Sequence, residues 1–122
     1  MDADDARHGP QWREAMAILR DLWRTSAGWS ETDPLAEMAR DAAVALSARI
    51  AVADEEEDPE DIARALDEAN GKLARLESLL ILARDLGQAG GDDLDPIVDR
   101  LDALGDALRE RARRLDGPFG DR

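Results

Sequence analysis

The chain has 122 residues, which is enough for one domain with a single core. Its 29 Asp and Glu residues outnumber 16 Lys and Arg residues, which gives a formal charge of −13. A chain with this net charge should repel nucleic acid and anionic lipid. Cysteine is absent, which excludes disulfides and thiolate metal sites. No run approaches the roughly 18 apolar residues of a membrane span, and the acidic N-terminus is unlike a signal peptide, so we expect a cytoplasmic protein.

The first predicted helix spans 10–28 and opens at Pro10, because proline at the first helical position lacks only an N–H that would be unpaired anyway. Apolar residues recur at helical spacing and predict one core-facing stripe that contains both Trp12 and Trp23. Trp29 follows in the loop, where it either caps the end of the core or protrudes as a docking anchor.

The second predicted helix spans 34–53 and opens with Asp33 and Pro34, a cap followed by proline. Its expected buried residues are Leu35, Ala39, Ala42, Leu46, Ile50 and Ala53. The helix is rich in alanine, so a neighbouring helix could approach its surface closely.

The third predicted helix spans 59–87 and has the most regular apolar series in the chain. The series is Ile62, Leu66, Ala69, Leu73, Leu76, Leu80 and Ala83. Gly71 lies inside this helix at a cost of about 1 kcal/mol relative to alanine. We expect the close approach of another helix to compensate for it.

Four consecutive apolar residues, Leu79 to Leu82, also lie in the third helix. Successive residues are about 100° apart, so these side chains point all around the helix and predict burial on more than one side. We therefore expect self-association into a ring. The expected interface consists of Leu79, Leu82 and Leu86, with the thin surface around Ala43 packing near Gly71.

The fourth predicted helix spans 93–115, with either Asp92 or Asp95 as its cap. Its inward residues are Ile97, Leu101, Leu104, Leu108 and Leu115. No stretch alternates with the period of a strand, and the connections are short. The expected fold is an all-α, antiparallel up-down four-helix bundle over 10–116, with flexible ends at 1–9 and 117–122.

The stretches 33–51 and 69–87 resemble the four-helix-bundle proteins encoded in 23S rRNA intervening sequences. They also resemble the related accessory variability determinant (Avd) proteins of diversity-generating retroelements. The matching residues are Trp12, Ala15, Leu19, Ala48, Ile50, Ala51, Gly71, Leu73, Leu76 and Glu77. The chain departs from the family pattern at Arg49, Val52, Ala53, Lys72 and Arg75, where the family has Asn, Glu, Gly, Ser and Glu.

The resemblance implies a homopentameric ring of bundles. In the Avd branch it also implies a basic surface that binds a reverse transcriptase and nucleic acid. The second implication transfers poorly, because this chain is acidic and that branch is basic.

Arginines recur on three predicted helices and are the candidates for a nucleic-acid-binding surface. They are Arg13, Arg20 and Arg24 in the first helix, Arg64 and Arg75 in the third, and Arg109, Arg111, Arg113 and Arg114 in the fourth. One alternative role is a docking surface for an acidic segment of a partner. The other is a solvated surface balanced by neighbouring carboxylates, with the last group interacting favourably with a helix C-terminus.

Seven carboxylates fall within residues 54–61. The run lacks the central glycine of a calcium-binding loop, so we expect no metal site. Glu55, Glu56 and Glu57 are candidates for docking to a basic protein partner. The alternative is a solvated loop whose acids favour the start of the third helix.

Nothing in the sequence supports catalysis. His8 is the only histidine, no glycine-rich phosphate loop follows a strand, and no Glu-x-x-His pair suits a di-iron bundle. We expect a non-catalytic scaffold or adaptor without a cofactor, which binds itself and a larger protein. The alternatives are a nucleic-acid-binding accessory protein of a diversity-generating reverse transcriptase and an acidic, antitoxin-like inhibitor.

Overall fold

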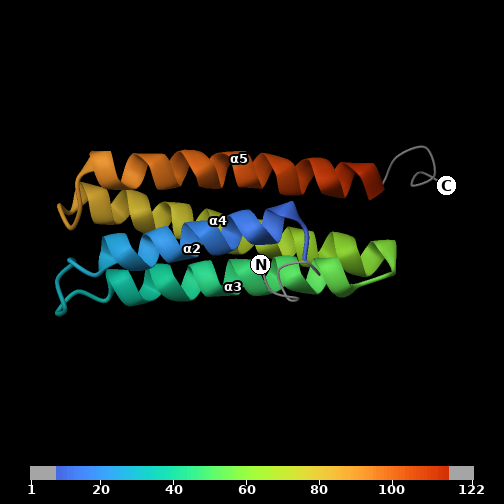
Figure 1. Cartoon of the computed structure of the whole chain (residues 1–122), viewed down its shortest axis with the longest axis horizontal. Helices are drawn as coiled ribbons and strands as arrows, with labels where there is room; N and C mark the ends of the chain where they lie inside the picture. The colour runs from blue at the N-terminus through green and yellow to red at the C-terminus, as the bar shows by residue number, and fades with distance from the viewer. Residues whose placement is uncertain (1–7, 116–122) are drawn as a thin grey trace.

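The computed structural model describes residues 8–115, which form four helices and contain no strand. The helices are α2 (Pro10–Ser26), α3 (Leu35–Glu55), α4 (Pro59–Asp85) and α5 (Gly91–Leu115). Consecutive helices run in opposite directions, and α5 returns to pack beside α2 (Figure 1). The predicted all-α, four-helix architecture is confirmed. The segments 1–7 and 117–122, expected to be flexible, lie outside the described residues.

The helix starts follow the proline signals. Pro10 and Pro59 each occupy the first turn of their helix, and the side chain of Asp58 accepts a hydrogen bond from the Glu60 N–H at 2.8 Å. At α3, Asp33 Oδ1 accepts from the Leu35 N–H at 3.0 Å. The expected start of α5 is wrong. The helix begins at Gly91, so Asp92 and Asp95, the expected caps, lie within it.

The end of α4 is fixed by a Schellman motif. Gly87 has a φ of 77°, the left-handed conformation that glycine adopts at little cost. The Gln88 N–H donates to the Ala83 carbonyl at 2.9 Å, and the Gly87 N–H donates to the Arg84 carbonyl at 3.1 Å. The Gln88 side chain then joins the two loops at this end of the bundle, accepting from the Ser30 N–H at 3.0 Å and donating to Asp33 at 2.9 Å.

The core runs along the bundle axis and contains the expected residues of α3, α4 and α5, except that Ile62 and Leu115 are only partly buried at its edge. The largest fully buried side chains are Ile18, Leu22, Leu46, Ile50, Leu66, Leu76, Leu80, Leu94, Leu101 and Leu108. Each contributes about 1.5–3 kcal/mol of burial free energy. This core is the main reason that the helices hold together.

The expected orientation of α2 needs a correction. The apolar stripe predicts Trp23 in the core, but 49% of this residue is exposed. The line of α2 that faces the bundle axis is Ala15, Ile18 and Leu22, and Trp12 is only partly buried. The apolar stripe of α2 is wide, and Trp23 lies on its flank.

Gly71 is not a point of close helix packing within the chain, and its expected contact with another copy stays a prediction. A Cβ atom added there would have nothing within 4 Å. In α5, by contrast, a Cβ added at the buried Gly105 would lie 3.6 Å from Leu73 Cδ2. Gly105 therefore faces α4 at ordinary contact distance.

None of the helices in the described region is both long enough and apolar enough to cross a membrane.

Candidate functional site

The apolar run on α4 divides between the core and the surface. Leu79 is 8% exposed and Leu80 is fully buried, whereas Ile81 is 37% exposed and Leu82 is 44% exposed. Leu86, at the end of the helix, is 61% exposed. We call Ile81, Leu82 and Leu86 the α4 outer face. A single chain leaves this face uncovered.

Two residues of the expected self-interface are wrong. Ala43 is 1% exposed and Leu79 is almost as inaccessible, so both belong to the core of the single chain. The physical reason is that each helix contacts two neighbours as well as the bundle axis, and a wide sector of its surface is therefore covered. Leu82, Leu86 and Gly71 do lie on the outside.

A second exposed apolar surface lies on α3, and it is absent from the sequence-based expectations. Val44 is 49% exposed, Val52 is 37% exposed, and Ala48 between them is also exposed. We call these three residues the α3 outer face. Their spacing of four places them on one side of the helix, away from Leu46 and Ile50, so the pattern itself could have revealed this face.

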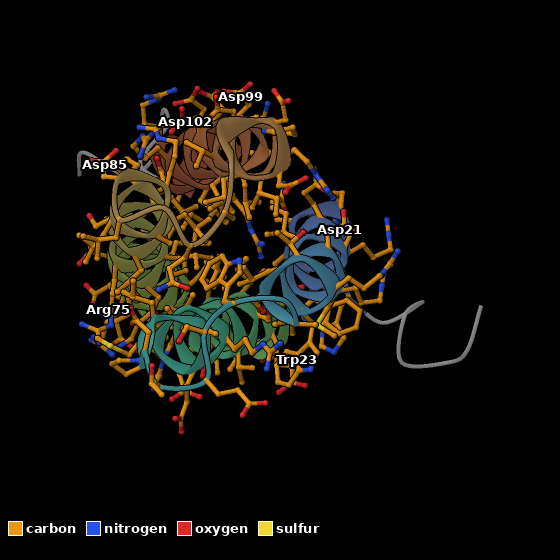
Figure 2. The ribbon with its side chains drawn as sticks, turned by 90° about the vertical axis from the view of Figure 1, so that its left-hand side faces the viewer. Asp21, Trp23, Arg75, Asp85, Asp99 and Asp102 are labelled. Carbon is orange, nitrogen blue, oxygen red and sulfur yellow. The ribbon has the colours of Figure 1, made fainter. Side chains whose placement is uncertain are left out.

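Trp23 is held in place by Arg40, which lies one helical turn before Val44 of the α3 outer face, although half of Trp23 is exposed. The Arg40 guanidinium lies 4.4 Å from the centre of the Trp23 ring, a cation–π contact. Arg40 also donates to the Trp23 carbonyl at 3.1 Å and to Ser26 Oγ at 2.8 Å. The indole projects outward near the junction of α2 and α3 (Figure 2).

Trp29, the expected docking anchor, is 6% exposed and belongs to the core cluster. It follows α2 at the end of the bundle and fills space there. The docking role is therefore wrong, and the capping alternative agrees with the structure.

Between α3 and α4 lies an open recess of about 440 Å³ with a mainly basic lining. It is lined by Arg49, Glu68, Gly71, Lys72 and Arg75. Arg49 pairs with Glu68 at 3.1 Å across the two helices. Lys72 and Arg75 are exposed, and neither pairs with a carboxylate within residues 8–115.

The structure does not bring the candidate nucleic-acid-binding arginines together. Those of α2 and those of α4 belong to helices that are not packing neighbours, and Figure 2 shows Arg75 and the α2 residue Asp21 on different sides of the bundle. Several also pair with acids of their own helix. These pairs are Arg24 with Asp21, Arg64 with Asp61, Arg109 with Asp106, and Arg113 with Glu110. Arg13 donates to the His8 carbonyl, and Arg20 is exposed.

The acidic run is not uniform. Glu55, Glu56 and Glu57 are exposed at the turn between α3 and α4. Asp58 caps α4, as described above. Asp54 is different, because only 9% of its side chain is exposed. Three of the acids are therefore available to a partner, while others have structural roles.

Asp54 joins three helices. Its carboxylate accepts from the Gly9 N–H at 3.1 Å, lies 2.9 Å from Arg111 Nη1, and lies 3.6 Å from His8 Nδ1. The His8 ring packs against Trp12 with 4.6 Å between centroids. Residues 8 and 9, predicted to belong to a flexible end, therefore have specific contacts.

Arg100 of α5 forms ion pairs with two carboxylates of α2 and so links the first and last helices of the bundle. It pairs with Glu14 at 2.7 Å and with Asp21 at 2.5 Å. The hydrogen bond from Arg100 to Glu14 is the main cause of a raised pKa for Arg100. Sequence reasoning missed this cluster because its members are far apart in the chain.

Glu77 on α4 and Asp102 on α5 form a carboxyl pair. Partial burial, and then the hydrogen bond and charge of Asp102, raise the pKa of Glu77 from 4.5 to about 7, although Arg109 acts in the opposite direction. A Glu77 carboxyl that keeps its proton can donate to Asp102. No group of three or more His, Asp or Glu side chains in residues 8–115 is placed to hold a metal ion.

No model of a known protein family matches the sequence, and a search of curated proteins finds no significant relative.

Proposed function

We propose that this protein is a non-catalytic scaffold or adaptor of the Avd-like four-helix-bundle type that associates with copies of itself. The observation that carries the proposal is the α4 outer face. Ile81, Leu82 and Leu86 are large apolar side chains, and the single chain leaves more than a third of each exposed.

Covering this face would be favourable. Removing apolar surface from water contributes roughly 25 cal/mol per Å², and contiguous exposed apolar surfaces mark interaction sites more often than scattered residues do. Leu82 and Leu86 are four residues apart, so they lie on one side of α4 and can enter one interface. Leu86 is the last residue before Gly87, which fixes the end of α4. Because the backbone at Leu86 is already ordered, less conformational entropy is lost on association.

The proposed assembly is a homo-oligomeric, pentamer-like ring, as the family resemblance implies. Such a ring would present many copies of each remaining surface to a larger protein partner. A reverse transcriptase is one such partner, but nucleic acid itself receives little support because the candidate arginines are dispersed and several are paired with acids.

A second candidate function is that of an acidic inhibitor. Glu55, Glu56 and Glu57 are adjacent and exposed, and none forms an ion pair within residues 8–115. This arrangement suits a basic cleft on another protein. Replacing all three with Gln should abolish binding to such a partner while helix content stays unchanged.

The primary proposal is tested by the mass of the protein in solution, measured by light scattering during gel filtration. The wild-type protein should have a mass several times that of one chain, which is 13.4 kDa. Leu82→Asp should shift the mass to that of one chain. Ala103→Asp introduces the same charge at an exposed position on α5 and should leave the mass unchanged. A wild-type protein of single-chain mass at micromolar concentration contradicts the proposal.

A further inference from the structure

The chain has two exposed apolar surfaces on two different helices. The α4 outer face is centred on Leu82, and the α3 outer face is centred on Ala48. The two helices are neighbours in the bundle (Figure 2), but both faces are directed outward to solvent. Neither face therefore covers the other within one molecule. Each face needs a partner.

We propose that the α4 outer face of one copy docks on the α3 outer face of a second copy. Leu82 of the first copy lies over Ala48 of the second, between Val44 and Val52. This inference rests on the proposed self-association and specifies the two surfaces that form it.

The shapes of the two faces fit. Ala48 is small and lies one turn from each valine, so the α3 outer face has a shallow hollow between two branched side chains. A leucine entering such a hollow is the usual way in which side chains of two packed helices interdigitate. Contact between unlike faces also covers both apolar surfaces at once. Contact between two α4 faces would leave every α3 face exposed.

The charges fit in the same register. Arg75 lies seven residues before Leu82, two turns away on the same side of α4. On α3, Asp41 lies seven residues before Ala48, and Glu55 lies seven residues after it. Placing Leu82 over Ala48 therefore brings Arg75 to a carboxylate whether the two helices run parallel or antiparallel. All three charged residues are exposed, and none forms an ion pair within residues 8–115.

Trp23 supports the same docking surface. Arg40 fixes its indole near the α3 outer face, so this large apolar group is already ordered before a partner arrives. Tryptophan and arginine are the residues that most often dominate binding energy, and preordering reduces the entropy lost on association.

The absence of cysteine from the sequence makes disulfide cross-linking a direct test. Leu82→Cys and Ala48→Cys are prepared as separate proteins, and each is oxidised alone and in an equal mixture. Single-cysteine chains can form only intermolecular disulfides. The two variants differ by three methylene groups, so intact mass spectrometry separates mixed dimers from dimers of either variant. Ala103→Cys, on α5, replaces Ala48→Cys in a control mixture.

We expect the mixture to give at least five times as much mixed disulfide dimer as the dimer that either variant forms when oxidised alone. The control mixture should give no mixed dimer. If the wild-type protein is oligomeric, disulfides that join only chains of the same variant, or no disulfide at all, overturn the pairing. A wild-type protein of single-chain mass overturns the proposed function as well, so the two failures can be told apart.

Discussion

Arg111 near the end of α5 lies 2.9 Å from the carboxylate of Asp54 near the end of α3, and the same carboxylate accepts a hydrogen bond from the backbone N–H of Gly9 before α2. One nearly buried charge thus holds three helices at one end of the bundle. Removing one partner of such a cluster leaves the others desolvated and unpaired.

Asp54→Ala should therefore lower the free energy of unfolding by about 2–3 kcal/mol. Urea unfolding followed by far-UV circular dichroism measures the change. Glu57→Ala removes an exposed carboxylate from the same acidic run and should change stability by less than about 0.5 kcal/mol. Equal effects of the two substitutions would contradict the structural role assigned to Asp54.

Glu77 should make stability depend on pH. Its pKa in the folded chain is raised to about 7, so the proton is bound more tightly in the folded state than in the unfolded state. The resulting stabilisation is fully present below the ordinary pKa of 4.5 and is lost as the pH rises through about 7. Glu77→Gln keeps a neutral donor beside Asp102, so it should be more stable than the wild type at pH 8.

The gain from Glu77→Gln at pH 8 should be about 1 kcal/mol after allowance for solvent screening, and it should vanish near pH 4.5. Urea unfolding at several pH values measures it. Glu31→Gln, at an exposed position in the loop between α2 and α3, provides the comparison for a general change in net charge. A gain that is the same at pH 4.5 and pH 8 would rule out the raised pKa as its cause.

Gly71→Ala should stabilise the folded chain by about 0.5–1 kcal/mol, because glycine is unfavourable inside a helix and an added Cβ has open space around it. Ala74→Gly, three residues further along the exposed side of α4, should cost a similar amount. Unfolding in urea measures both changes. Destabilisation by Gly71→Ala, combined with a loss of oligomer, would instead place Gly71 in tight contact with another copy.

Reversing the charge of Arg75 should weaken association at least tenfold if Leu82 docks over Ala48. The dissociation constant of Arg75→Glu can be measured by analytical ultracentrifugation. A second substitution then reveals the direction of docking. Rescue by Asp41→Arg indicates parallel helices, whereas rescue by Glu55→Arg indicates antiparallel helices. Unchanged affinity in Arg75→Glu would remove this residue from the interface.

The architecture could be predicted because its signals are local. Pro10 and Pro59 mark helix starts through backbone geometry, and Leu66, Leu73 and Leu80 repeat every seven residues along one side of α4. These signals depend on neighbours within two turns. Most of the helix limits, but not the start of α5, and most of the core follow from them.

The roles of individual surface residues depend on distant neighbours and could not be predicted in the same way. Trp23 fits the apolar period of α2, but the period alone does not tell which part of a wide stripe faces the axis. The pattern predicts Ala43 and Leu79 in an interface with another chain, because a sequence does not give the width of the sector that neighbouring helices cover. The sequence does not distinguish Asp54 from the other six acids of its run, since Gly9 and Arg111 are far from it in sequence.

Because α2 begins and α5 ends toward the same end of the bundle, a fluorophore attached near the start of α2 or near the end of α5 would lie toward one pole (Figure 1). The Gln88 side chain ties the two loops at the other pole, which lies beyond Trp23 and Leu86. A molecule immobilised at either of these helix ends would therefore point the Gln88 pole away from the support.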